Sequence, residues 1–208
     1  MMGSPIIRSD YSQHIADDMP QNLFLIGYRG TGKSTVGPLV AARLGWAFVD
    51  ADELTEATAG MSIKEIFAKE GETGFRNREA ATLAELASRT NHVIATGGGV
   101  ILRESNRAVL RKSGFVVWLS ATPEAAWERI QADAATAARR PNLTVAGGLD
   151  EVCTLLATRE PLYRAAANVE IRTDGLSPEA VADAIFRAWN GGSTSPPSSG
   201  ACSSSSSA

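Results

Sequence analysis

A glycine-rich stretch directly after a short apolar run constrains the fold more than any other feature of the sequence. Residues 23–26 are apolar, and residues 27–35 read GYRGTGKST. Glycines at this spacing let successive backbone N–H groups curl around a polyphosphate, and a helix that begins near Lys33 adds its positive N-terminal dipole. The pattern therefore predicts a P-loop for a nucleoside triphosphate. The predicted phosphate-binding residues are Gly30, Thr31, Gly32, Lys33, Ser34 and Thr35.

Two side chains of this stretch have roles that follow from the motif. Lys33 is expected to reach the β- and γ-phosphates, and the Ser34 hydroxyl is expected to ligate Mg²⁺. The alternative is an ordinary glycine-rich turn before a helix. The apolar run in front and the helix-forming run 36–44 behind supply the strand–loop–helix context that the motif requires, so they favour the P-loop.

Short apolar runs alternate with longer amphipathic stretches along the chain. Helix-start signals stand between the runs: Ser62 and Glu65 form a capping box, and Thr122 and Ser177 each precede a proline. Apolar strands separated by helices indicate an α/β fold with a parallel sheet covered on both faces. The predicted strands lie at 23–26, 48–49, 93–95, 115–119 and 169–171.

The two ends of the chain differ from this alternating part. Residues 1–20 mix polar and acidic groups without a clean period, and from residue 191 onward Gly, Ser, Pro and Thr dominate. The second composition buries too little apolar area to offset the ordering of the backbone. We expect a flexible N-terminal extension over 1–20, one folded domain over 21–190 and a disordered tail over 191–208.

Composition narrows the class of protein. The net charge of −3 argues against a broad nucleic-acid-binding surface. No apolar stretch approaches the roughly 18 residues of a membrane span, and the N-terminus lacks the basic start and apolar run of a signal peptide. The two cysteines, Cys153 and Cys202, are not expected to form a disulfide, which fits a reducing compartment. We expect a cytoplasmic enzyme without nucleic-acid or membrane partners.

Two acidic residues follow the second predicted strand. Asp50 and Asp52 stand at its C-terminal end, and ligands of open parallel sheets bind in the crevice at those strand ends. One carboxylate is expected to help hold Mg²⁺ through water, since Mg²⁺ keeps several of its waters. The other is expected to face a substrate hydroxyl and to orient it or accept its proton. The alternative is that Asp is simply common at strand ends and helix caps.

Arginines and glycines supply further candidates. Arg76 and Arg78 stand in a helix predicted to open at Gly74, and their spacing points them in different directions, one toward the cleft and one toward solvent or an acid. Residues 97–99 are three glycines after the third strand, which expose backbone donors and permit close approach of a ligand. Surface salt bridges and a plain flexible turn are the alternatives.

Two more arginines lie in the second half of the chain. Arg140 precedes a proline and a loop with paired glycines, which is typical of a lid that closes over ATP and shields the phosphoryl group from water. An exposed basic linker is the alternative. Arg159 is predicted near the end of a helix that begins around Asp150, where it could serve only the helix dipole.

Taken in order, these motifs resemble those of the shikimate kinase family. The resemblance covers about residues 22–189, essentially the whole predicted domain. The P-loop is shared with many unrelated enzymes, whereas the ordered set of the other motifs is far more specific. The segments that carry the resemblance are GYRGTGKST at 27–35, DAD at 50–52, GETGFR at 71–76, TGGG at 96–99, RP at 140–141 and REPLY at 159–163.

The resemblance implies ATP:shikimate 3-phosphotransferase activity with Mg²⁺, by a monomer. It implies a fold of the nucleoside-monophosphate-kinase type, with three layers (α/β/α), a five-stranded parallel sheet and a mobile lid. The substrate-binding part would lie at about 51–80 and the lid at about 134–149. Arg129 and the loop 173–178 are the candidates for the adenine side. Asn142 departs from the family, which usually has leucine after the proline of the lid.

The resemblance also assigns residues to the two substrates. On the donor side, Lys33 and Ser34 would serve phosphate and metal, Asp50 would lie near Mg²⁺, and Arg140 would offset charge on the transferring phosphoryl group. On the acceptor side, Asp52 would contact the hydroxyls of shikimate and act as base or orienter.

The rest of the acceptor site would bind the carboxylate and complete the pocket. Arg76 and Arg159 would grip the carboxylate, for which paired guanidinium groups are suited. Gly97, Gly98 and Gly99 would line the pocket. The catalytic residues under this interpretation are Lys33, Asp52 and Arg140.

Other functions compete with this interpretation. A different small-metabolite kinase such as gluconate kinase would share the P-loop, but not necessarily the DAD and GGG motifs together with Arg159. A nucleotide-dependent switch of the GTPase class normally carries N-K-x-D, which the sequence lacks. A catalytically silent nucleotide-binding protein is the third possibility, and the intact Lys33, Asp52 and Arg140 argue against it.

Overall fold

The computed structural model describes residues 22–132 and 148–191. Strands and helices alternate along these two ranges, as the spacing of the apolar runs predicts. The strands are β1 (Asn22–Ile26), β2 (Ala47–Asp50), β3 (His92–Ala95), β4 (Phe115–Ser120) and β5 (Val169–Arg172). The helices are α2 (Lys33–Leu44), α3 (Ala51–Ala59), α4 (Ile63–Ala87), the 3₁₀ turn η1 (Val100–Leu102), α5 (Glu104–Ser113), α6 (Pro123–Ala132), α8 (Gly148–Ala166) and α9 (Pro178–Gly191).

The five strands form one parallel sheet in the order β2-β3-β1-β4-β5. The α/β prediction and the five-stranded parallel sheet are confirmed. The chain runs outward from β1 to β2, returns through β3, and then crosses β1 to reach β4. The strand order therefore reverses at β1, and ligands of open α/β sheets bind at such a switch point.

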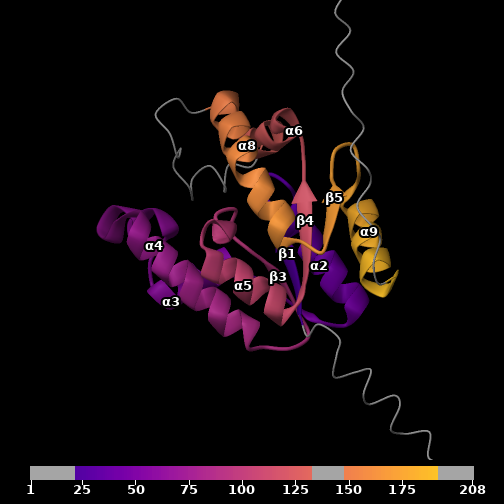
Figure 1. Ribbon diagram of the computed structural model, residues 1–208, viewed down its shortest axis with the longest axis horizontal. Helices are drawn as coiled ribbons and strands as arrows, with labels where there is room; N and C mark the ends of the chain where they lie inside the picture. Colours follow the sequence, from indigo (N-terminus) through magenta and orange to yellow (C-terminus); the bar gives the residue numbers. More distant parts are fainter. Residues whose placement is uncertain (1–21, 133–147, 192–208) are drawn as a thin grey trace, which may run out of the picture.

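Helices cover both faces of the sheet, which gives the three layers (Figure 1). On one face, Leu23 and Leu25 pack with apolar side chains of α2 and α9. On the other face, Phe24 and Ile26 pack with side chains of α4, α5 and α8. Because successive side chains of a strand point to opposite faces, the apolar residues 23–26 of β1 contribute to both cores.

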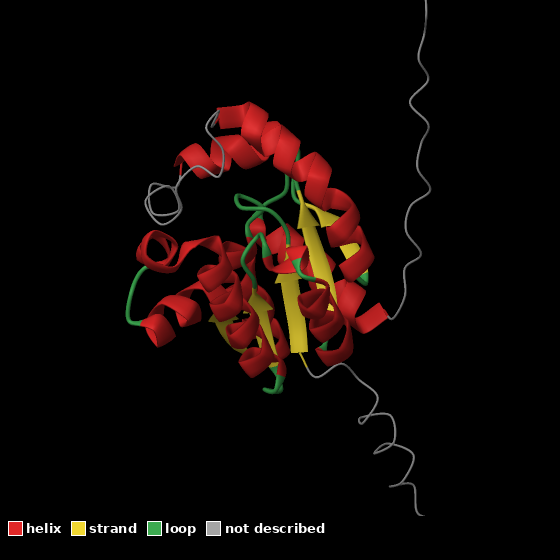
Figure 2. Cartoon of the chain, turned by 60° about the vertical axis from the view of Figure 1, so that its left-hand side comes forward, coloured by secondary structure: helices red, strands yellow, loops and turns green. Residues whose placement is uncertain are grey.

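The carboxyl ends of three neighbouring strands lie in line. Asp50 at the end of β2 is opposite Ala95 of β3, and Ala95 is opposite Leu25 of β1. In Figure 2 the strands run toward the end of the sheet where the connecting loops gather. The P-loop, the acidic pair and the glycine turn therefore begin side by side at one edge of the sheet.

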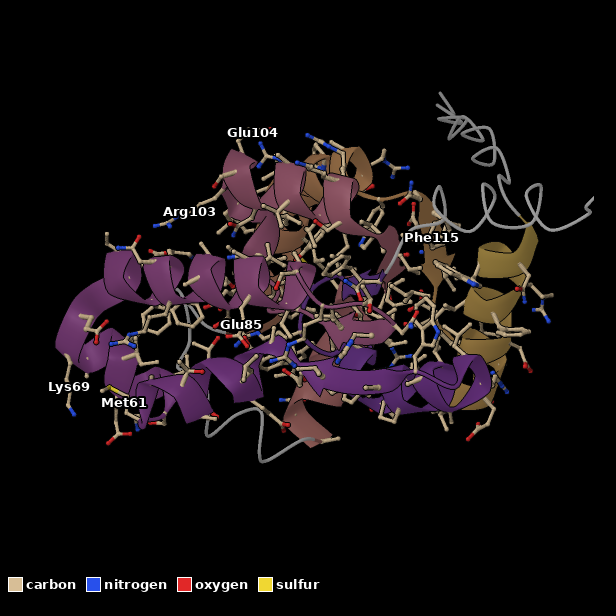
Figure 3. The ribbon with its side chains drawn as sticks, turned by 90° about the horizontal axis from the view of Figure 1, so that it is seen from below. Met61, Lys69, Glu85, Arg103, Glu104 and Phe115 are labelled. Atoms are coloured by element: carbon tan, nitrogen blue, oxygen red, sulfur yellow. The ribbon has the colours of Figure 1, made fainter. Side chains whose placement is uncertain are left out.

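The helix that carries Arg76 begins earlier than predicted. The sequence places its start at Gly74, but α4 starts at Ile63 behind the Ser62–Glu65 capping box and continues to Ala87 with a kink at Gly71. Gly71 has φ 68° and ψ −174°, a conformation that favours glycine, so the break falls three residues before the predicted one. In Figure 3, Met61 and Lys69 lie at the outer end of the α3–α4 pair.

Two other predicted helix starts agree with the structure. The Thr122 hydroxyl accepts a hydrogen bond from the backbone N–H of Ala125 at the start of α6. The Ser177 hydroxyl accepts one from Ala180 at the start of α9. Within the two described ranges, no helix is both long enough and apolar enough to cross a membrane. The predicted extension 1–20 and nearly all of the tail 191–208 lie outside the described residues.

Asn22 generates a prediction for stability. Its buried amide donates to the Arg89 carbonyl at 2.7 Å, and its Oδ1 accepts from the His92 N–H at 3.1 Å, so one side chain holds β1 to the segment that enters β3. Asn22→Ala removes both hydrogen bonds and leaves the Arg89 carbonyl and the His92 N–H without this partner. We expect a loss of about 1–3 kcal/mol in the free energy of unfolding, measured by urea denaturation. Asn190→Ala, the same change at an exposed position, is the control. A loss below about 0.5 kcal/mol for Asn22→Ala would contradict the assignment.

Candidate active site

The loop between β1 and α2 has the backbone that phosphate binding requires. Gly27 and Gly30 have φ of 140° and 78°, and a Cβ at either position would collide with a neighbouring backbone carbonyl. Gly32 caps α2 with φ 87° and makes no side-chain capping hydrogen bond. The first N–H groups of α2 therefore have no cap side chain in front of them, and they point toward the loop as an anion site.

The Lys33 side chain folds back over this loop. Its Nζ donates to the carbonyl oxygens of Gly27 and Tyr28, each at 2.8 Å, and the residue is 9 % exposed. Burial and the two backbone acceptors thus hold the ammonium group at the loop. A phosphate in the loop would meet a cation that is already in place.

Asp50 links the P-loop to the acidic motif. Its Oδ2 accepts a hydrogen bond from Ser34 Oγ at 2.6 Å, and its Oδ1 accepts one from the Asp52 N–H at 2.9 Å as the cap of α3. The alternative of a helix cap therefore applies to this residue, which also contacts the P-loop serine. Asp52 follows in the first turn of α3, at the same edge of the sheet.

The glycine turn after β3 packs directly against the P-loop. An ideal Cβ at Gly98 would lie 3.4 Å from the Gly27 carbonyl oxygen and 3.5 Å from the Arg29 backbone nitrogen. The Gly98 carbonyl accepts a 2.5 Å hydrogen bond from the hydroxyl of Tyr163, a fully buried residue of α8. None of the sequence motifs predicts this role of Tyr163. Nothing local identifies it, because the two residues are 65 positions apart.

Arg76 lies under the glycine turn. Its Nη1 donates to Glu79 at 2.9 Å, its Nη2 to Glu72 at 3.3 Å, and the residue is 9 % exposed. A Cβ at Gly99 would overlap its guanidinium group. Arg78, by contrast, points outward and pairs with Glu70. The two arginines diverge as their spacing predicts.

Arg159 lies within α8 and not near its end, so the prediction about its position is wrong. The helix continues through Pro161 to Ala166, seven residues beyond Arg159. A role restricted to the helix dipole does not apply at that distance, since the effect falls off within the last turn. Arg159 is 7 % exposed, and its guanidinium carbon lies 5.8 Å from the centroid of the Tyr28 ring. Among the described residues, no carboxylate is paired with it.

Arg129 connects the P-loop with the loop after β5. It donates to Thr173 Oγ1 at 2.8 Å, to the Thr173 carbonyl at 2.9 Å and to the Gly30 carbonyl at 3.3 Å. Asp174 in the same loop accepts from the Thr122 N–H at 3.0 Å. Burial raises the pKa of Asp174, but hydrogen bonds from Thr122 and Arg172 outweigh burial and lower it overall. Both candidates for the adenine side therefore lie next to each other beside the P-loop.

Arg140 and the predicted lid up to residue 147 lie outside the described residues. The last two residues of the predicted lid, Gly148 and Leu149, belong to the first turn of α8.

The arrangement defines a class of protein. A P-loop at the switch point of a parallel sheet holds a nucleoside triphosphate, and the acid, glycine turn and buried arginines beside it suit a small anionic acceptor. The fold and site are those of a P-loop kinase for small metabolites.

Comparison with known proteins identifies the family. The family model described as shikimate kinase matches residues 29–190. A shikimate kinase from Rhodopirellula baltica is 49 % identical over 169 residues, which is 81 % of this chain and 90 % of that protein. The structure of shikimate kinase from Acinetobacter baumannii in complex with shikimate is 39 % identical, has a TM-score of 0.76 and covers 83 % of this chain and 94 % of that one.

The chain belongs to the shikimate kinase family. It is a kinase of this family, and its phosphoryl donor is ATP. A gluconokinase from Sinorhizobium meliloti, at 22 % identity and a TM-score of 0.52 over 81 % of this chain and 91 % of that one, shares the fold alone.

The contact between Gly99 and Arg76 generates a second prediction. Gly99 has φ −102°, so alanine is compatible with the backbone, but its methyl group would displace the Arg76 guanidinium. Gly99→Ala should raise KM for shikimate about tenfold or more, since overpacking costs about 1–3 kcal/mol, and leave the Kd of ADP within about twofold. Steady-state kinetics and calorimetry measure the two quantities. The control is Gly191→Ala, where a Cβ meets nothing within 4 Å. An unchanged KM in Gly99→Ala would show that Arg76 is not held by this contact.

Proposed function

We propose that the P-loop edge of the sheet holds ATP with Mg²⁺ and that the glycine turn and α8 hold shikimate opposite the γ-phosphate. The observation that carries this assignment is the Ser34–Asp50 hydrogen bond of 2.6 Å. It joins the first turn of α2 to the end of β2 and brings the two predicted metal ligands together. A hydroxyl and a carboxylate are hard oxygen donors of the kind that Mg²⁺ prefers.

The donor side rests on the loop and the start of α2. The backbone N–H groups of residues 30–35 would cradle the phosphates, with Lys33 against the β- and γ-phosphate oxygens. Mg²⁺, held by Ser34 and near Asp50, would neutralise charge on those oxygens when bound. The Gly27 and Tyr28 carbonyls that hold Lys33 keep the ammonium aimed into the loop, which reduces the reorganisation needed when ATP binds.

The acceptor side begins with Asp52. This residue stands two positions after the metal-side acid, on the first turn of α3, so one short segment reaches both substrates. Its carboxylate would orient the 3-hydroxyl of shikimate and accept its proton as the hydroxyl oxygen attacks the γ-phosphorus. The bond from that phosphorus to the β,γ-bridging oxygen would break, and ADP would leave with this oxygen.

Two buried arginines would hold the shikimate carboxylate. Arg76 is held by its ion pair with Glu79 and by its close contact with Gly99. Arg159 lies over the Tyr28 ring. Guanidinium groups fixed before binding lose little rotamer entropy when they meet a planar anion. The backbone of residues 97–99 would line the pocket between them.

Several further assignments belong to the same proposal. Arg140 would approach the transferring phosphoryl group with the lid, and Arg129 with the loop 173–178 would border the adenine. The enzyme would act as a monomer in the cytoplasm, without nucleic-acid or membrane partners. The absence of N-K-x-D favours adenine over a GTPase-type guanine site.

The role of Asp52 is tested by Asp52→Asn. The amide keeps the shape but cannot accept the proton, so kcat should fall by about 10²–10⁴, the usual contribution of general acid–base help. The Kd of ADP should stay within about twofold. Glu53→Gln makes the same carboxylate-to-amide change at the next position, which is exposed. This control should keep near-normal kcat. If kcat of Asp52→Asn equals that of the wild type, Asp52 has no catalytic role.

The carboxylate assignment is tested by Arg76→Ala and Arg159→Ala. Each should raise KM for shikimate about 10- to 150-fold, which corresponds to one hydrogen bond to a charged group, about 1.5–3 kcal/mol. ATP binding should change little. Arg78→Ala is the control, because Arg78 shares the helix of Arg76 but pairs with Glu70 at the surface. Loss of ATP binding with normal KM for shikimate would place these arginines on the donor side instead.

A further inference from the structure

An ion pair inside the protein joins the P-loop to the first turn of α8. Arg29 Nη2 lies 2.9 Å from Glu151 Oε1, and the side chains are 10 % and 0 % exposed. The two residues are 122 positions apart, and none of the motifs discussed above assigns a function to either side chain. Removing two charges from water costs several kcal/mol per ion, so a pair at this depth requires an explanation other than surface solubility.

The surroundings of this pair point to the acceptor site. The Tyr28 ring, 1 % exposed, has Arg29 on it at 5.6 Å and Arg159 at 5.8 Å, both measured from the guanidinium carbon to the ring centroid. Two cations therefore share one buried ring. Glu151 lies on the same helix as Arg159, eight residues earlier, which is about 12 Å along the axis.

The charges are distributed unequally in this group. Glu151 is paired with Arg29, while Arg159 has the face of an aromatic ring and, within the described part of the chain, no acidic partner. A cation over a ring is held more weakly than a cation in a buried hydrogen-bonded ion pair. Arg159 is accordingly the arginine of the two that an incoming carboxylate can engage without breaking an existing ion pair.

We propose that Arg29 and Glu151 form a positioning pair for the acceptor site. Glu151 compensates the charge of Arg29, keeps it directed away from the substrate, and ties the start of α8 to the P-loop. The placement of Arg159 relative to the nucleotide loop then depends on the pair. This inference rests on the proposed role of Arg159 as a ligand of the shikimate carboxylate.

Loss of the pair should affect KM and kcat differently. In Glu151→Gln, Arg29 keeps its charge beside the Tyr28 ring without compensation, and it competes with Arg159 for space and for the anion. Carboxylate binding is common to the ground state and the transition state, so the change should appear in KM more than in kcat. Removing both charges in Arg29→Met/Glu151→Gln should relieve the competition.

The experiment compares Glu151→Gln, Arg29→Met and the double variant with the wild type in the full-length enzyme. KM for shikimate, kcat, the Kd of ADP and Tm are measured for each. We expect Glu151→Gln to raise KM for shikimate about tenfold, with kcat and the Kd of ADP within about threefold, and the double variant to recover most of that loss.

Two controls separate positioning from stability. Asp183→Asn breaks another ion pair between elements, Arg43–Asp183 at 2.9 Å between α2 and α9, at a half-exposed place away from the site. Ile185→Ala empties a fully buried position in the opposite core and lowers Tm without touching α8. Both should keep the wild-type KM, even where Ile185→Ala matches or exceeds the Tm loss of Glu151→Gln.

Three results within this set of variants would overturn the inference. KM of Glu151→Gln within twofold of the wild type is the first, and an equal rise of KM in Ile185→Ala is the second. A double variant with a KM higher than that of Glu151→Gln is the third. If Arg159→Ala itself has a normal KM for shikimate, the proposed role of Arg159 fails and the inference fails with it. A raised KM in Arg159→Ala beside a normal one in Glu151→Gln rejects the pair alone.

Discussion

The site depends on one backbone contact, the packing of the glycine turn after β3 against the P-loop after β1. A Cβ at Gly98 would lie in van der Waals contact with the Gly27 carbonyl and the Arg29 backbone nitrogen, so the two loops lie side by side. Because β1 and β3 are hydrogen-bonded neighbours, this contact follows from the sheet and needs no side chain. The two loops are thus held at a fixed separation, and with them the proposed donor and acceptor groups, as phosphoryl transfer between positioned groups requires.

Helix α8 contacts both of these loops. The Tyr163 hydroxyl binds the Gly98 carbonyl, and Arg159 contacts the Tyr28 ring one turn earlier on the helix. Each contact reaches a loop that follows a different strand. The same helix therefore contacts both loops, and a shift of the helix would move Arg159 relative to the glycine turn. Tyr163 and Ala166 also belong to the core on this face, so burial of apolar surface supplies the stability that holds the helix there.

The sequence predicted what is local and missed what is distant. The strands, the capping box at Ser62 and the phosphate loop depend on neighbouring residues, and the structure has them where the patterns indicate. The break in α4 was misplaced, because Gly71 and Gly74 look alike in a sequence while only Gly71 takes a positive φ. Arg159 was predicted near the end of a helix that begins around Asp150, yet α8 continues through Pro161 to Ala166. The partners of Tyr163 and Arg29 lie far along the chain, beyond any local pattern.

The remaining question is why a site for two anions contains so many acids. Arg76 is paired with Glu79 and Arg29 with Glu151, and all four side chains are nearly buried. An uncompensated guanidinium at such depth would be costly, and several together would repel one another. The acids therefore permit a cluster of cations to exist beneath the site before any substrate arrives. Arg159 differs because an aromatic ring, rather than a carboxylate, covers it among the described residues. Its charge is the least compensated of the three, and the shikimate carboxylate would supply the missing partner at the moment of binding.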